Sequence, residues 1–142
     1  MVMLEELEFD AMILSGLPKT ERKFTKIEME GKDFNVRTFY TGSADDGKKT
    51  LVFTHGFIGP TVMYFYAMAQ LAQKYRIVMF DNCCKGMNTR LETTNATDSH
   101  ESAQQWLLEF ITKTIDALDD LPNKFYLAGH SMGGFYAALY AS

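Results

Sequence analysis

The chain has 142 residues, of which 46% are hydrophobic, 13% aromatic and 23% charged, and these values exclude a disordered, collagenous or low-complexity protein. Fourteen Lys and Arg residues against eighteen Asp and Glu residues give a net charge of −4 without any basic tract, which argues against nucleic-acid binding. The two cysteines, Cys83 and Cys84, are adjacent, and this disfavours both a relaxed disulfide and a closed zinc site. We therefore expect two reduced thiols, no metal and no cofactor.

Residues 1–20 are expected to form a helical segment ahead of the main domain. The apolar residues that recur there at helical spacing are Met3, Leu4, Leu7, Ala11 and Leu14. We expect this apolar side to pack on the rest of the protein. Peripheral contact with a membrane or lipid surface is the alternative, which the acidic polar side disfavours for anionic lipid. The acidic start is unlike a signal peptide and no run approaches eighteen apolar residues, so we expect a cytoplasmic protein.

The remaining pattern, over residues 21–142, predicts one α/β domain. Two alternating runs, 22–30 and 33–41, are separated by Gly31-Lys32, which predicts a tight hairpin. Short apolar runs typical of strands buried on both faces follow at residues 51–54, 76–80 and 124–128. Helical spacing occurs at residues 61–74, at residues 99–118 and from Met132 onward. Strands that alternate with helices predict a mostly parallel sheet with right-handed crossovers.

The strongest motif is Gly129-His130-Ser131-Met132-Gly133, a G-x-S-x-G sequence between a predicted buried strand and a predicted helix. A serine in that setting lies on a sharp turn whose crowded backbone excludes side chains at the two glycines and exposes the hydroxyl above the sheet. The N-terminus of the following helix favours negative charge nearby. We predict that Ser131 is a catalytic nucleophile; the alternative is a glycine-rich structural turn with an incidental serine.

A second motif, His55-Gly56-Phe57-Ile58-Gly59, directly follows the first buried strand. Acyl transfer develops negative charge on the carbonyl oxygen of the substrate, and two preorganised donors about 3 Å away stabilise it. We predict that these donors are the backbone N–H groups of Phe57 and Met132. We expect His55 to brace the loop rather than to act as a base.

A third segment, which begins at Asp81 and includes Gly86, follows the second buried strand. The three motifs, in this order and at these separations, resemble the α/β-hydrolase superfamily over residues 22–142. Residues 101–142 most closely resemble the subgroup that includes lysophospholipases, N-acylphosphatidylethanolamine lipases and cardiolipin deacylases. The third segment departs from the family pattern Asp-x-x-Gly-x-Gly-x-Ser, because Cys84 replaces the first glycine and Asn88 the serine. The local conformation of this loop is therefore open.

The resemblance implies a triad ordered as serine, acid and histidine, with the acid and the histidine beyond the sixth strand. The chain stops eleven residues after Ser131, and we expect none of His55, His100 and His130 to replace the missing base. We therefore expect the N-terminal half of a serine hydrolase or acyltransferase, inactive by itself, whose acyl-serine intermediate forms from an ester or lipid. The alternative is a non-catalytic lipid- or protein-binding protein, since some members of the subgroup are regulatory.

The strand at residues 124–128 would have no partner along one side in this chain, and it contains neither charge nor proline after Lys124. An unpaired apolar edge is a template for intermolecular strand pairing. We therefore expect the isolated chain to be prone to aggregation, whereas its oligomeric state in the cell stays open.

Overall fold

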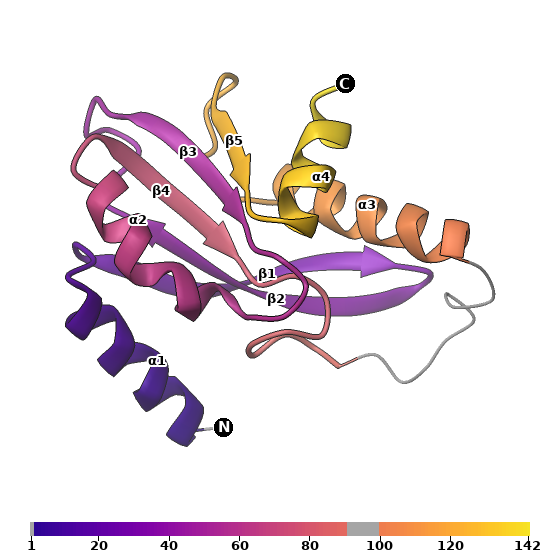
Figure 1. The fold of residues 1–142 in the computed structure, drawn as a ribbon, viewed down its shortest axis with the longest axis horizontal. Helices are drawn as coiled ribbons and strands as arrows, with labels where there is room; N and C mark the ends of the chain where they lie inside the picture. Colours follow the sequence, from indigo (N-terminus) through magenta and orange to yellow (C-terminus); the bar gives the residue numbers. More distant parts are fainter. Residues whose placement is uncertain (1, 91–99) are drawn as a thin grey trace.

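The computed structural model describes residues 2–90 and 100–142 (Figure 1). In chain order its elements are α1 (Val2–Ser15), β1 (Thr20–Met29), β2 (Lys32–Thr41), β3 (Lys49–Thr54), the 3-10 helix η1 (Thr61–Tyr64), α2 (Phe65–Leu71), β4 (Tyr75–Phe80), α3 (His100–Asp116), β5 (Tyr126–Gly129) and α4 (Met132–Tyr140). The strands form one sheet in the order β1-β2-β4-β3-β5. Strands β4, β3 and β5 run parallel to one another, and β2 joins the β1–β2 hairpin to β4 in antiparallel orientation. The predicted α/β fold is confirmed.

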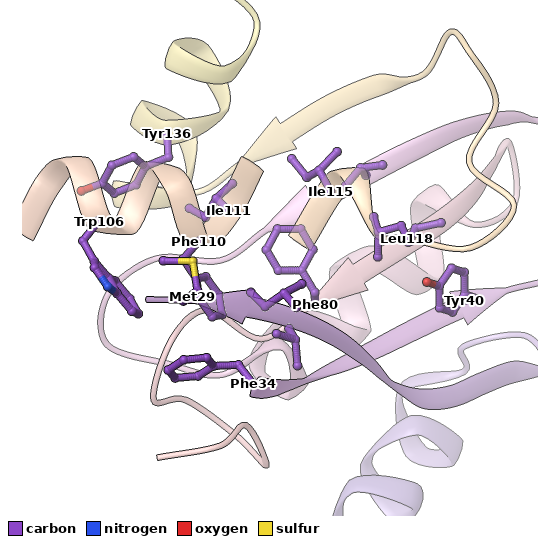
Figure 2. Packing of buried hydrophobic residues seen from close by; sticks show 14 residues of the cluster. Met29, Phe34, Tyr40, Phe80, Trp106, Phe110, Ile111, Ile115, Leu118 and Tyr136 are labelled. Carbon is purple, nitrogen blue, oxygen red and sulfur yellow. The ribbon is translucent and has the colours of Figure 1, made fainter. Parts of the chain in front are cut away.

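Helices cover both faces of the sheet (Figure 1). On one face, α3 contributes Trp106, Phe110 and Ile115 to a core that also contains Tyr136 of α4 (Figure 2). On the other face, α1 and α2 pack over a second core that includes Met12 and Phe65. Strand β4 illustrates the consequence for the sequence, because alternate residues of its apolar run enter the two different cores. A strand buried on both faces needs such a continuous run.

The hairpin turn lies one residue earlier than the sequence pattern predicts. Glu30 and Gly31 are the two turn residues, with φ values of 51° and 73°, whereas Lys32 already pairs with Met29 as the first residue of β2. A two-residue turn with positive φ at both positions matches the twist of the strands that it joins. The backbone N–H of Gly31 also donates to the Glu28 carboxylate at 2.6 Å, which stabilises this turn.

The two middle helices are shorter than predicted. The helix expected over residues 61–74 begins with η1, in which the N–H of Met63 donates to the carbonyl of Pro60 at 3.2 Å, and α2 ends at Leu71. Such 3-10 turns are common at helix starts. The helix expected over residues 99–118 is α3, and residue 99 lies outside the described residues.

Helix α1 is present as predicted and packs against η1 and α2, but its orientation is unexpected. The buried residues of this helix are Glu8 and Met12, whereas the leucines of the predicted packing side are exposed. The Glu8 carboxylate pairs with the buried Arg37 guanidinium, whose Nε donates to it at 3.0 Å, and with Arg22 at 3.4 Å. An unpaired buried charge is costly, so this ion pair sets the rotation of α1 against its hydrophobic pattern.

Candidate active site

Ser131 lies on a sharp turn between the end of β5 and the start of α4. Its φ of 53° and ψ of −124° are strained for a residue with a side chain. A Cβ atom on Gly133 would overlap the carbonyl oxygens of Thr54 and His55, and one on Gly129 would overlap the backbone of residues 133–134. The turn, the start of α4 and the end of β3 can therefore approach one another this closely only with glycine at both positions. The result is an exposed Ser131 at the carboxyl end of the parallel strands.

The loop after β3 passes directly against this turn. A Cβ atom on Gly56 would lie 3.3 Å from the Cβ of Ser131 and 3.2 Å from Nδ1 of His130, so little room remains for a larger residue. Phe57 follows Gly56, and its mostly exposed ring lies 4.8 Å from the Lys85 ammonium. On the other side of Ser131, Met132 begins α4, and the first N–H groups of a helix have no partner within it. Both predicted donors thus belong to segments that adjoin Ser131.

The His55 ring is fully buried and connects the loops after β3 and β4. Its Nδ1–H donates to the carbonyl of Gly56 at 2.7 Å, and its Nε2 accepts the backbone N–H of Asn82 at 2.8 Å. These partners assign the proton to Nδ1. Burial lowers the pKa of His55 and outweighs the opposing effects of the hydrogen bond to Gly56 and of the Asp81 charge, and the ring is therefore neutral. Because both nitrogens have partners, His55 braces the two loops.

Asn82 holds the same two loops together through its side chain. Its Nδ2–H donates to the carbonyl of His55 at 2.6 Å, and its Oδ1 accepts the Thr54 hydroxyl at 2.9 Å. The preceding residue, Asp81, accepts the backbone N–H of Thr61 at 2.7 Å and so fixes the start of η1. Asn82 was not predicted as a site residue, although an amide directly after a buried strand is a usable signal.

The loop after β4 is ordered although Cys84 and Asn88 depart from the family pattern. Cys84 has a φ of 59°, a backbone conformation that glycine adopts more readily, at the position where the family has glycine. Asn88 is buried: its Oδ1 accepts the N–H of Arg37 at 2.6 Å and its Nδ2–H donates to the carbonyl of Asp81 at 2.6 Å. A Cβ atom on Gly86 would collide with the Asp81 carboxylate. Asn88 thus ties the loop to β2.

Cys83 and Cys84 are free thiols whose sulfur atoms lie 3.3 Å apart. Burial raises the pKa of the Cys83 thiol, so this thiol stays protonated at neutral pH. Within residues 2–90 and 100–142, His, Cys, Asp and Glu side chains form no group of three or more that could hold a metal ion.

The side chain of His130, which precedes Ser131 in the chain, reaches η1. Its Nδ1 lies 2.9 Å from the hydroxyl of Tyr64, with which it shares a hydrogen bond. Tyr64 was not predicted as a site residue, and nothing in its helical sequence pattern marks it. His100 begins α3, and its side chain lies outside the description. Among the side chains that the structure describes, no imidazole forms a hydrogen bond with Ser131.

The model of the alpha/beta hydrolase fold family matches residues 49–142, which is more than half of the sequence. These residues contain β3, β4, β5, the loops between them and the Ser131 turn. The chain therefore belongs to the α/β-hydrolase family. The resemblance to the superfamily is confirmed, whereas the resemblance to the lysophospholipase subgroup stays a prediction.

Comparison with individual proteins agrees with this assignment. The chain is 32% identical to the 1-acylglycerol-3-phosphate O-acyltransferase of Arabidopsis thaliana over 128 residues, which cover 89% of this chain and 29% of that protein. It is 30% identical to epoxide hydrolase 4 of Homo sapiens over 112 residues, which cover 78% of this chain and 28% of that protein. The chain thus spans less than a third of the length of these curated relatives.

Among solved structures, the fold is similar to that of a membrane phospholipase A described as a bacterial virulence factor. The TM-score is 0.68 at 20% sequence identity, and the match covers 99% of this chain and 40% of that one. This likeness concerns the fold. No helix in residues 2–90 and 100–142 combines the length and the apolar composition that crossing a bilayer requires.

Proposed function

We propose that Ser131 is the nucleophile of a serine hydrolase or acyltransferase that acts on a carboxylic ester of the lipid class. The observation that carries this proposal is the strained turn at Ser131, which glycines on both sides permit and which exposes the hydroxyl next to a helix N-terminus. A backbone strained in this way is maintained only where the surrounding structure enforces it. The similarity to an acyltransferase of acylglycerol phosphate and to a phospholipase supports a lipid acyl group as substrate.

In the proposed reaction, the Ser131 oxygen attacks the carbonyl carbon of the ester, and its proton passes to a base. The backbone N–H groups of Phe57 and Met132 stabilise the negative charge that develops on the carbonyl oxygen. The ester bond then breaks, the alcohol leaves with a proton, and the acyl group stays on Ser131. Attack by water yields an acid, whereas attack by a second alcohol yields a new ester; both restore the serine.

The base is the component that the described residues do not supply. Nε2 of His55 already accepts the Asn82 N–H, and His130 is bonded to Tyr64. The family resemblance implies an acid and a histidine that follow Ser131 in the order of the triad. We therefore propose that the 142-residue polypeptide carries the nucleophile and the oxyanion donors and has low activity by itself.

Labelling with a fluorophosphonate probe, with and without imidazole in solution, tests the proposal. We expect slow labelling alone and faster labelling with imidazole, which supplies the missing base, with the adduct on Ser131 by peptide mass spectrometry. Ser131→Ala should abolish the adduct, whereas Ser142→Ala, a change at another exposed serine, should retain it.

Two results would change the proposal. An adduct that survives Ser131→Ala, or no adduct at any imidazole concentration, would overturn Ser131 as nucleophile and favour the non-catalytic lipid- or protein-binding alternative. Fast labelling without imidazole would retain the nucleophile but show that one of the three histidines reaches it.

A further inference from the structure

Helix α1 presents a row of exposed apolar side chains that we call the apolar stripe, formed by Met3, Leu4, Leu7 and Leu14. Leu4 is 51% exposed, Leu7 57% and Leu14 86%. These leucines are three, seven or ten residues apart and therefore lie along one side of the helix. The stripe stays exposed because the Glu8–Arg37 ion pair holds another side of α1 against the sheet. Among residues 2–90 and 100–142, the stripe therefore stays largely uncovered.

Leu4 and Leu7 of the apolar stripe also line a cavity between α1 and the loops after β3 and β4. This cavity of about 160 Å³ is lined by the apolar residues Leu4, Leu7, Pro60, Val62 and Met87, together with Glu8, Asp81 and Gly86. Asp81 directly follows β4, so the cavity lies at the carboxyl end of the parallel strands, where Ser131 also lies. Figure 1 shows the N-terminal end of α1 on the side of the molecule toward which β3 and β4 point.

Further exposed apolar residues lie on the loop after β3 and on η1. Ile58 is 89% exposed, Phe57 is 65% exposed and Met63 of η1 is 68% exposed. Phe57 and Ile58 belong to the loop that packs against Ser131, and Met63 lies in the helix against which α1 packs. Large apolar side chains that are exposed close together often mark an interaction surface. Exposed apolar residues thus occur on α1, on the adjacent η1 and on the loop at the rim of the candidate active site.

The charges around the apolar stripe restrict what can cover it. Helix α1 contains four acidic residues and no basic residue. Glu8 is neutralised by Arg37, whereas Glu6 and Asp10 are exposed and flank the stripe. The α1 end of this surface is repelled by anionic lipid and contributes no lysine or arginine to bind it, whereas at the other end the Lys85 ammonium lies 4.8 Å from the Phe57 ring. An apolar surface with zwitterionic head groups provides the burial without the repulsion.

We propose that the apolar stripe and the exposed residues Phe57, Ile58 and Met63 dock on a zwitterionic lipid surface, which brings the rim of the Ser131 site to its substrate. The choice of a lipid rather than a protein partner rests on the proposed function, because the surface ends at a site to which we assign an acyl ester substrate. The leucines enter the acyl region of the surface, and the acidic residues stay at the head groups.

The test is co-sedimentation of the 142-residue chain with phosphatidylcholine vesicles and with vesicles of equal parts phosphatidylcholine and phosphatidylglycerol. We expect binding to the first, weaker binding to the second, and little change with added salt. The double variant Leu7→Ser/Leu14→Ser should bind phosphatidylcholine vesicles at least tenfold more weakly. Leu139→Ser is the matched control, because Leu139 is an exposed leucine on α4, which covers the opposite face of the sheet. It should bind as the original chain does.

The outcomes separate this proposal from the proposed function. Ser131→Ala should bind vesicles fully, so a chain that binds vesicles but gives no adduct with the fluorophosphonate probe retains the lipid surface without the enzyme. Equal binding by the double variant and the original chain, no binding by the original chain, or preference for the anionic vesicles would overturn the lipid surface. A dimer in solution that only the double variant loses would assign the stripe to a second copy of the chain and would also overturn it. Circular dichroism spectra of the variants should match that of the original chain.

Discussion

The Ser131 turn and helix α1 acquire their conformations in opposite ways. At the turn, three small residues within five positions determine the backbone path, because any Cβ on Gly129 or Gly133 would overlap neighbouring backbone atoms. In α1, the hydrophobic spacing indicates one packing side, yet the helix packs through Glu8 and Met12. A single ion pair to Arg37, which is 29 residues away in sequence, decides the orientation.

The difference teaches which kinds of sequence pattern translate directly into structure. Steric exclusion of side chains acts over a few residues and leaves no alternative path for the backbone. Burial of an apolar side is a free-energy balance that a buried charge can reverse, since an unpaired buried carboxylate costs more than a few exposed leucines. The exposed groups also differ, because the strained turn exposes the Ser131 hydroxyl and the reoriented helix exposes apolar side chains.

The largest expected effect comes from Gly133→Ala, which tests whether steric exclusion of side chains determines the Ser131 turn. The new methyl group would meet the carbonyl oxygens of Thr54 and His55, which are backbone atoms that cannot move aside. We expect a loss of about 4 kcal/mol in the free energy of unfolding, measured by urea denaturation with circular dichroism at low protein concentration. In Gly59→Ala, the matched control, the methyl group would meet only the flexible end of Met63, and the loss should be about 1 kcal/mol. Equal losses in the two variants would mean that crowding does not determine the turn.

Glu8→Gln tests whether the ion pair sets the orientation of α1, because it leaves the Arg37 charge buried without its counter-charge. We expect a loss of about 3 kcal/mol in the free energy of unfolding, together with faster proteolysis within α1 as the helix detaches. Glu6→Gln, a change at an exposed position of the same helix, should change stability by no more than about 0.5 kcal/mol. If Glu8→Gln is equally mild, packing of Met12 rather than the ion pair holds α1.

Strand β5 is a third case for this comparison. Its apolar run predicts a strand from a few neighbouring residues, whereas the exposure of its edge depends on which strands pair with it. Within the described residues β5 pairs only with β3, and Tyr126 is partly exposed at this edge. We expect the 142-residue polypeptide to self-associate with increasing concentration, and Tyr126→Lys, which adds a charge to the edge, to shift the population toward monomer. Size-exclusion chromatography with light scattering measures both. A monodisperse monomer at all concentrations would contradict this expectation.

The smallest expected effect is the pH dependence of stability that His55 contributes. Burial lowers its pKa in the folded state below the ordinary value of 6.5, so between those two values the unfolded chain binds more protons than the folded chain. Stability should therefore fall as the pH decreases below about 6.5, by no more than about 1.4 kcal/mol per pH unit. His55→Asn should flatten this slope between pH 5 and 7, as measured by urea denaturation at each pH.

The sequence predicted the α/β class, the order of the elements and the motif around Ser131, because these features depend on hydrophobic period and on steric rules that act over a few neighbouring residues. Even the hairpin turn was misplaced by only one residue, since Glu30 shares the positive φ that the pattern assigned to glycine. The family resemblance rests on the same local features, and it is confirmed for the superfamily.

Only the tertiary structure decided how the site is held and which surface stays free. The hydrogen bond between Tyr64 and His130 spans 66 residues, and the one between Arg37 and Asn88 spans 51. No sequence pattern predicts that the two residues of either pair lie close together, because their proximity results from the order of the strands in the sheet. The same reason applies to Glu8 and Arg37: the charge of each is visible in the sequence, but the burial that makes their attraction decisive exists only after β2 and α1 have packed together.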